Sequence, residues 1–341
     1  MTILNKNNEQ ESNGHYAGID VGAKELVLVT RSNASSCKAQ KFPNDAKGRA
    51  RLVGKLVMLP GVRVCMEATG VYYLNLANDL DDAGIALMVL NPKASYNFAR
   101  ALMKNSKNDA VDAETLAQYV ERMDFVPWIR PTKEKIALRS LSRRIESLTK
   151  QKAAAKNHLH ALTSSQETPK VVLKDVKKGI SQLEKRIEML SKETRSFIKK
   201  HPELEHVFQL LTSIKGIAST SAIALMGELL LLPQGLSNRE WVKFAGLDPC
   251  SFTSGSSVHK KEKLSKTGNY HIRSALYMPA LCATQHDPYV KAYSQHLIAN
   301  GKEPLQALCA VMRKLLHAIH GMLRYNKPFD NTRFYAIPES A

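Results

Sequence analysis

The chain has 341 residues, 44% of them hydrophobic and 23% charged, which is ordinary for a soluble globular protein of two or three domains. No apolar run approaches the roughly 20 residues of a membrane helix, and the polar residues 1–14 exclude a signal peptide. The five cysteines lack zinc-binding spacing and suit a reducing compartment. We therefore expect a cytoplasmic protein with no membrane partner, which in a bacterium would meet the chromosome in the same compartment.

The charge is strongly positive, because 49 lysines and arginines outnumber 31 aspartates and glutamates and give a formal net charge of +18. Residues 130–200 alone carry 19 basic and 7 acidic side chains, so the middle of the chain supplies most of the excess. This excess favours a polyanionic partner, most commonly nucleic acid, over a protein that is merely basic.

Residues 15–130 alternate between strand and helix patterns after a tail, residues 1–14, that we expect to be disordered. Strands are expected at 16–20, 26–30, 38–42, 62–66 and 85–90, and helices at 45–58, 71–83, 92–103 and 109–122. This order predicts an α/β domain with a mixed sheet and helices on its faces. The layout resembles the fold of ribonuclease H and the RuvC-like nucleases.

Four acids of this predicted domain form a candidate metal site. Asp20 lies in an apolar strand, where a carboxylate is costly unless something pairs with it, and Glu67 ends a second apolar run. Asp109 and Asp112 are three residues apart and share one face of a helix, whereas Glu114 faces away and is left out. Carboxylate oxygens are the ligands that Mg²⁺ prefers, with Mn²⁺ as a substitute. Two such ions would assist phosphoryl transfer.

A purely structural interpretation of the last two acids stays open at this point. Asp109 would then be the N-cap of its helix, and Asp112 an exposed acid of the first turn that favours the helix dipole. The spacing taken alone favours this interpretation over a metal site.

Residues 131–201 follow a heptad pattern in two segments separated by a polar loop. The apolar positions are Leu138, Leu141, Ile145, Leu148, Ala155, Leu159 and Leu162 in the first segment, and Val176, Ile180, Leu183, Ile187, Leu190 and Phe197 in the second. Two helices with matching seams predict a coiled-coil hairpin that joins protomers into a dimer or tetramer. A packed helical spacer is the alternative, and the basic outer faces either follow phosphates or are simply solvated.

Residues 202–330 predict a mostly α-helical domain, with helices at 238–245, 270–284, 288–300 and 304–325 and a tail at 331–341. Residues 210–225 resemble a helix-hairpin-helix, in which Lys215 and Gly216 would contact DNA phosphate. An ordinary helical turn explains the same residues equally well.

Residues 250–258 read as a serine- and glycine-rich loop that contains Ser254, Ser256 and Ser257. A serine hydroxyl attacks phosphorus when its proton is removed and the phosphate is neutralised. Serines in such loops are far more often linker residues. The neighbouring basic residues either bind nucleic acid or are solvated, and they are Lys260, Lys261, Lys263 and Lys266.

Several motifs carry a more specific resemblance. They are GIDVG at 18–22, CMEATGVY at 65–72, LNP at 90–92, KNDAVDAETLA at 107–117, FAGLDP at 244–249, SGSSV at 254–258, LSKTGNYHIRSALYMPA at 264–280 and MRKLLHAIHGMLRYNKPFD at 312–330. Their order from about Tyr16 to Asp330 resembles the insertion-sequence one-ten family of transposases. This family comprises bridge-RNA-guided DNA recombinases, and the site-specific pilin-gene invertase is a relative.

The resemblance implies an N-terminal RuvC-like domain whose DEDD acids, Asp20, Glu67, Asp109 and Asp112, hold Mg²⁺. It implies a C-terminal transposase domain in which Ser254 attacks DNA and forms a covalent phosphoserine link. It further implies that a structured RNA pairs with donor and target DNA, and that protomers assemble so that the acids of one serve the serine of another.

Other functions stay open from the residues themselves. One is a metal-dependent hydrolytic nuclease of the Holliday-junction-resolvase type, in which water attacks and the C-terminal domain only binds. Another is a site-specific DNA invertase that works without RNA. A third is a basic nucleic-acid scaffold whose acids are only helix caps and surface residues.

Overall fold

The computed structural model describes residues 14–68, 70–104, 108–233, 235–254 and 258–337. The chain divides into two units, residues 1–130 and residues 131–341, and we describe each by itself. Almost all of the N-terminal tail predicted at 1–14 lies outside the described residues. Within the ranges given above, we find no helix that has both the length and the apolar character to span a membrane.

The N-terminal unit is built on a mixed six-stranded sheet with the order β3-β2-β1-β5-β6, in which β4 also pairs with β2. Its strands are β1 (His15–Val21), β2 (Glu25–Ser32), β3 (Ser35–Ser36), β4 (Gln40–Pro43), β5 (Arg63–Glu67) and β6 (Ala86–Leu90). β1 is antiparallel to β2 but parallel to β5, and β5 is parallel to β6. The sheet confirms the predicted α/β architecture, and short β3 is the strand that the sequence did not predict.

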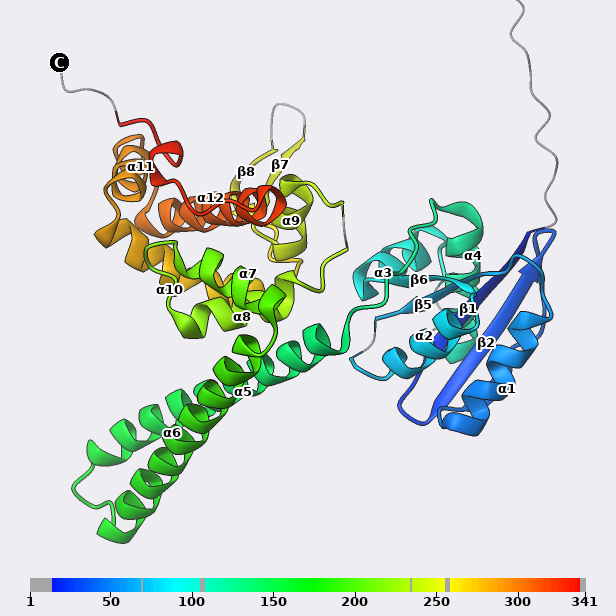
Figure 1. The fold of residues 1–341 in the computed structure, drawn as a ribbon, viewed down its shortest axis with the longest axis horizontal. Coiled ribbons are helices and arrows are strands. Elements are labelled where there is room, and N and C mark those ends of the chain that lie inside the picture. The colour runs from blue at the N-terminus through cyan, green and yellow to red at the C-terminus, as the bar shows by residue number, and fades with distance from the viewer. Residues whose placement is uncertain (1–13, 69, 105–107, 234, 255–257, 338–341) are drawn as a thin grey trace, which may run out of the picture. The chain divides into compact units, whose positions relative to one another are not determined.

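Helices cover both faces of this sheet (Figure 1). They are α1 (Ala46–Val57), α2 (Tyr73–Asp82), α3 (Pro92–Ala101) and α4 (Asp109–Arg122). Side chains alternate along a strand, so Ala17 and Ile19 of β1 form a core with Leu52 of α1 and Leu76 of α2. On the opposite face, Leu116 and other apolar residues of α4 pack against β5 and β6. The face of β1 that carries Gly18 and Asp20 is therefore the face toward α4.

The C-terminal unit begins with two long helices, α5 (Lys133–Thr163) and α6 (Lys170–Lys199), which lie side by side as a helical hairpin (Figure 1). The predicted seam is the less exposed side of each helix, with Leu148 and Ile180 buried and Leu159 and Leu183 half-buried. The helical hairpin follows the prediction, whereas supercoiling and the joining of protomers stay predictions.

The rest of this unit is mostly helical. Its helices are α7 (Pro202–Thr212), α8 (Ser219–Leu229), α9 (Asn238–Ala245), α10 (Tyr270–His286), α11 (Pro288–Ala299) and α12 (Pro304–Tyr325), followed by a 3₁₀ turn at Asn331–Arg333. They share one hydrophobic core to which Leu138 of α5 and Ile198 of α6 also belong. Phe334 is buried in the same core, so the predicted tail at 331–341 starts within the packed structure.

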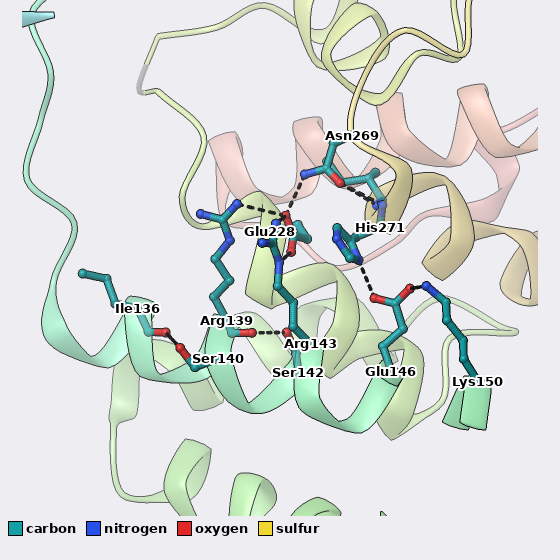
Figure 2. A network of polar contacts seen from close by, with 11 residues as sticks. Ile136, Arg139, Ser140, Ser142, Arg143, Glu146, Lys150, Glu228, Asn269 and His271 are labelled. Atoms are coloured by element: carbon teal, nitrogen blue, oxygen red, sulfur yellow. Dashed lines mark hydrogen bonds and ion pairs between the residues drawn. The ribbon is translucent and has the colours of Figure 1, made fainter. Parts of the chain in front are cut away.

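A buried polar network joins α5 to α8 and α10 in this unit (Figure 2). Glu228 of α8, with a side chain only 2% exposed, accepts hydrogen bonds from Arg143 Nε at 2.7 Å and Arg143 Nη2 at 3.1 Å. Asn269 Nδ2 donates to the same carboxylate at 2.6 Å, and Arg139 lies 3.7 Å away. Burial raises the pKa of Glu228, but these donors and charges outweigh it and hold the pKa below its ordinary value. The network fixes the first turns of α5 onto the core.

The segment predicted as a serine- and glycine-rich loop is instead largely a β-hairpin. β7 (Pro249–Ser254) pairs with antiparallel β8 (Val258–Leu264), and the basic stretch supplies the second strand. Contacts at the base of the hairpin explain the difference: the Ser265 hydroxyl donates to Asp248, and Leu264 packs against the core. These contacts hold the two segments in register, so cross-strand pairing outweighs the weak strand propensity of a lysine-rich sequence.

Candidate active site

Two of the predicted acids lie side by side at one edge of the sheet. Ile19 of β1 pairs with Met66 of parallel β5, so the next residues, Asp20 and Glu67, occupy equivalent positions on neighbouring strands. Ile19 and Met66 belong to the core beneath α1 and α2, and the side chains that follow them alternate to the opposite face. Both carboxylates therefore lie on the face that α4 covers.

The other two acids come from the first turn of α4. Asn108 is the N-cap, because its side chain accepts a hydrogen bond from the backbone N–H of Val111 at 2.9 Å. The cap is therefore the residue before Asp109, and Asp109 is not needed for capping. Asp109 is exposed and Asp112 is half-buried. The predicted helix bounds, 109–122, are those observed.

Gly18 allows α4 to lie directly on β1. A Cβ atom at this position would stand 2.0 Å from the Ala113 carbonyl oxygen and 2.3 Å from the Ala117 nitrogen, far closer than any allowed contact. The absence of a side chain therefore brings the helix backbone against the strand. Because Asp20 is two residues further along β1, the same contact brings the start of α4 toward its carboxylate.

Electrostatics show that the four acids form one cluster. Burial raises the pKa of Asp20 most, and the charges of Asp109, Asp112 and Glu67 raise it further, in that order. A hydrogen bond with the backbone of Val21 opposes the shift, and the resulting pKa is about 6 instead of 3.8. Carboxylates that repel one another in this way are stabilised when a cation lies between them.

Glu67 has a partner that the sequence did not predict. The Ser95 hydroxyl, on α3, lies 2.6 Å from Glu67 Oε2 and 2.9 Å from the Pro92 carbonyl oxygen, and Ser95 is 8% exposed. This contact fixes the orientation of the carboxylate. The signal for it was the Asn91-Pro92 helix start, which places Ser95 in the first turn directly after β6.

Glu114 lies in a different environment from the four acids. Its carboxylate accepts hydrogen bonds from Arg31 Nη1 at 2.5 Å and from the Ser36 hydroxyl at 2.7 Å. Arg31 is 5% exposed and also binds Glu121 of the same helix. This network attaches α4 to β2, which is a structural role.

The donor set suits a divalent cation, but the carboxylates do not converge on one point. Among the described residues, no three His, Cys, Asp or Glu side chains stand close enough together to hold an ion as they are placed. The residues still fit such an ion chemically, since all four offer hard carboxylate oxygens, and the charges of the other three add to the effect of burial in raising the pKa of Asp20. The arrangement is a cluster of like charges from two strands and one helix.

Ser254 is the last residue of β7, opposite Val258 on β8. The residues at the tip of the hairpin, 255–257, lie outside the described part of the chain, and they include Ser256 and Ser257. Of the predicted nucleic-acid-binding lysines, Lys260, Lys261 and Lys263 belong to β8 and Lys266 follows it. The side chains of Lys263 and Lys266 are exposed.

The turn predicted to bind DNA phosphate lies between α7 and α8. Gly216 has a φ of +107°, and a Cβ on it would stand 2.6 Å from the Pro279 carbonyl oxygen of α10. Glycine is therefore required here for close packing of the turn on α10. Lys215 is exposed, whereas Ile214 and Ile217 are buried, so the lysine faces solvent while the two isoleucines hold the turn on the core. Contact with DNA stays a prediction.

An α/β unit that gathers acids at one sheet edge, in a chain that is strongly basic elsewhere, is the layout of an enzyme that acts on nucleic acid phosphodiesters. A family model described as Transposase matches residues 17–165, and one described as Transposase IS116/IS110/IS902 family matches residues 208–295. The two matches together cover more than half of the chain, which belongs to the IS110 family of transposases. It is thus a DNA recombinase that cleaves and joins DNA strands.

Similar proteins span nearly the whole chain. The pilin gene-inverting protein of Moraxella bovis is 28% identical over 323 residues, which cover 92% of this chain and 97% of that protein. The protein of the same description from Moraxella lacunata is 27% identical over 326 residues, with the same coverage. The transposase for insertion sequence element IS1328 of Yersinia enterocolitica is 23% identical over 300 residues, which cover 80% of this chain and 84% of that protein.

Solved structures are similar over a smaller part of the chain, and a RuvC structure is an example. RuvC of Thermus thermophilus, in complex with a Holliday junction substrate, matches 33% of this chain and 99% of its own chain. The sequence identity is 14% and the TM-score is 0.27.

Proposed function

We propose that this recombinase cuts DNA with the Ser254 hydroxyl as nucleophile, assisted by a divalent cation that Asp20, Glu67, Asp109 and Asp112 hold. The observation that carries the proposal is that three other acids act on Asp20: burial raises its pKa most, and the charges of Asp109, Asp112 and Glu67 raise it further, to about 6. A cluster of repelling carboxylates at a solvent-accessible sheet edge weakens folding, and it is typical of a cation site. In a transposase, the chemistry for such a site is phosphodiester transfer.

The chain's own residues divide the work in this proposal. The acids are positioned by β1, β5 and α4, and Ser95 orients Glu67. A bound Mg²⁺, or Mn²⁺ in its place, would neutralise the phosphate that is attacked. The position of α4 determines where two of the acids lie, because Asp109 and Asp112 both belong to its first turn.

The serine step needs no external energy source, because each phosphodiester bond that breaks is replaced by a new bond to the same phosphorus. The Ser254 oxygen loses its proton and bonds to phosphorus, and one deoxyribose oxygen leaves with a proton as a free hydroxyl. A hydroxyl of a second DNA strand then attacks the phosphoserine, forms the new phosphodiester and restores the serine. The phosphoserine keeps the energy of the broken bond, which is why this route supports joining as well as cutting.

We further propose that a structured guide RNA selects the DNA sites and that the chain works as a homo-oligomer. The support for RNA is the net charge of the middle segment, where residues 130–200 carry 19 basic and 7 acidic side chains. The support for assembly is the α5–α6 hairpin, whose seam residues Ala155, Leu159 and Leu162 are only half-buried in the single chain. Half-exposed apolar seams are stabilised by further helices.

A covalent-adduct assay tests the serine. Wild-type protein is incubated with labelled DNA of the element's ends and Mg²⁺, and protein-linked DNA is counted after denaturation. Ser254→Ala is expected to abolish the adduct because its side chain has no oxygen to bond to phosphorus. Ser256→Ala and Ser257→Ala are the matched controls, and both are expected to keep it.

Other outcomes of this assay would assign a different nucleophile or a different mechanism. Adducts that persist in Ser254→Ala and disappear in one of the neighbouring variants would assign the nucleophile to that neighbour. Free DNA ends without attached protein in the wild type would contradict the serine mechanism and favour hydrolysis by water. Sequencing of RNA that copurifies with the protein from its host tests the guide, which is expected to match DNA flanking the gene.

A further inference from the structure

A cavity of about 440 Å³ lies within the C-terminal unit, between α9, α11, α12 and the start of β7. Five basic residues line it: Arg239 and Lys243 from α9, and Arg313, Lys314 and His317 from α12. The pairs Arg239–Lys243 and Arg313–His317 are each four residues apart, so each pair lies on one face of its helix. Two helices therefore direct their basic faces into the same cavity.

The positive charge of this pocket is not balanced by ion pairs. Within the described residues, none of the five basic side chains forms a salt bridge. The acid of the pocket lining is Asp248, whose carboxylate already accepts a hydrogen bond from the Ser265 hydroxyl. Elsewhere in the same unit, Arg143 pairs with Glu228 and Arg195 pairs with Glu205. The pocket thus differs from the arginine sites that stabilise the fold.

Two of the basic groups show the effect of this environment. Burial lowers the pKa of His317, and the charges of Arg313, His320, Arg239 and Lys314 lower it further. Burial also lowers the pKa of Lys314. The Lys314 ammonium lies 4.3 Å from the ring centre of Tyr293 and 5.1 Å from that of Phe334, which fixes its position. The pocket is electropositive and preorganised, and an anion would relieve its repulsion.

The remaining walls suit a nucleotide better than a simple ion. Val242, Pro249 and Tyr293 give the pocket an apolar side, and a volume of about 440 Å³ exceeds what one phosphate group requires. Protein grooves that bind nucleic acid strands typically combine basic side chains with an aromatic ring. Pro249 is also the first residue of β7, which ends at Ser254. At ~3.3 Å per residue, five residues of strand separate the pocket from Ser254 by roughly 17 Å.

We propose that this pocket, formed by Arg239, Lys243, Arg313, Lys314 and His317, binds a backbone phosphate of a nucleic acid strand, with the adjoining sugar or base against Val242, Pro249 and Tyr293. The ligand is a phosphodiester, and both DNA and RNA offer it. The pocket holds the strand at the base of the β7–β8 hairpin. This binding is independent of which residue is the nucleophile, and its test needs no cleavage.

Fluorescence anisotropy of the full-length protein in EDTA tests the pocket. The probes are a labelled 30-nucleotide single-stranded DNA, RNA of the same sequence, and the corresponding DNA duplex, each titrated at several salt concentrations. The test variant is the double change Arg239→Gln with Arg313→Gln. The control is Lys291→Gln with Lys302→Gln, which removes two positive charges from exposed positions of the same unit.

The pocket variant is expected to bind at least one probe about tenfold or more weakly, while the control changes affinity less than about threefold. The slope of log affinity against log salt is expected to fall by about 1 to 2 for the pocket variant. A loss confined to DNA or to RNA identifies the source of the phosphate. Equal affinity of the pocket variant and the control for all three probes would overturn the proposal.

A second variant distinguishes a loss of phosphate binding from a loss of folding. Lys243 is exposed, so Lys243→Gln leaves the core unchanged and is expected to weaken binding about threefold to tenfold with an unchanged melting temperature. The charge-preserving change Arg239→Lys with Arg313→Lys is expected to keep most of the affinity. The phosphate assignment is wrong if two results occur together. Lys243→Gln would bind like the wild type, and the double change of Arg239 and Arg313 to lysine would weaken binding as much as their double change to glutamine.

Discussion

Burial disfavours the charged form of both Asp20, which is half-buried, and Glu228, which is buried, yet the pKa values of the two acids shift in opposite directions because their neighbours differ. Glu228 is surrounded by Arg143, Arg139 and Asn269, and its pKa is held below the ordinary value. Asp20 is surrounded by other acids, and its pKa is raised to about 6. Burial raises the pKa at both sites; the neighbours of Glu228 reverse that shift, whereas the neighbours of Asp20 add to it. The comparison separates an acid that stabilises the fold from one whose ionisation is disfavoured, which is what we expect of the cation ligand proposed above.

The first prediction removes the charge at the stabilising site. Glu228→Gln leaves Arg143 and Arg139 without a buried anionic partner and is expected to lower the free energy of unfolding by about 2–4 kcal/mol. Urea unfolding of the full-length protein, followed by circular dichroism, measures this loss. The control is Glu188→Gln, an exposed acid that pairs with Lys192 on α6 and whose substitution is expected to change little.

The pH dependence of the same site follows from its lowered pKa. Since the folded-state pKa of Glu228 lies below the unfolded value, its contribution is present above the unfolded pKa and is lost as the pH falls through the folded pKa. Wild type and Glu228→Gln are therefore expected to differ most near pH 7 and to converge in acid. A difference that is constant with pH would show that packing, not charge, explains the loss.

The second prediction separates α4 from β1. Gly18→Ala places a Cβ 2.0 Å from the Ala113 carbonyl oxygen, so the helix has to shift, at a cost of about 1–3 kcal/mol or more. Because Asp109 and Asp112 move with α4, recombination is expected to fall far more than the stability loss explains. The measurement is strand cleavage at a temperature well below the melting transition of the variant. Gly54→Ala, on α1 with open space around it, is the matched control.

The third prediction concerns the acid cluster without metal. Because the folded-state pKa of Asp20 is raised from 3.8 to about 6, the folded state binds more protons, and stability falls as the pH rises through this interval. Asp20→Asn removes the repulsion and is expected to stabilise the protein at pH 8 in EDTA by about 1–2 kcal/mol. Thermal melting between pH 4 and 8 measures the effect, which should vanish near pH 4. A destabilised variant at pH 8 would contradict the repulsion.

Sequence patterns predicted the elements that local signals define. The bounds of α4 and the strands that carry Asp20 and lead into Glu67 follow from periodicity and capping residues. The pairing of β1 with β5 then follows from the order of strands and helices. For this reason the sheet-edge placement of two acids was predictable from the chain alone.

The parts that the sequence did not predict depend on residues far apart in the chain. Ser95 meets Glu67 across 28 positions, and Arg143 meets Glu228 across 85. The β7–β8 hairpin was interpreted as a loop because its serines, glycine and lysines lack an apolar alternation, and contacts at its base decide its structure. The basic pocket likewise forms only when α9 and α12 pack together. Single-sequence patterns contain no signal for such pairings.

Binding of a divalent cation tests the central claim most directly. Isothermal titration of wild type and Asp20→Asn with Mg²⁺ or Mn²⁺ at pH 8, without nucleic acid, isolates the acid cluster from every later step. We predict that the wild type binds the cation, and that Asp20→Asn binds it at least tenfold more weakly. Equal binding by the two proteins, or no binding by the wild type, would contradict the proposal that these carboxylates hold a metal.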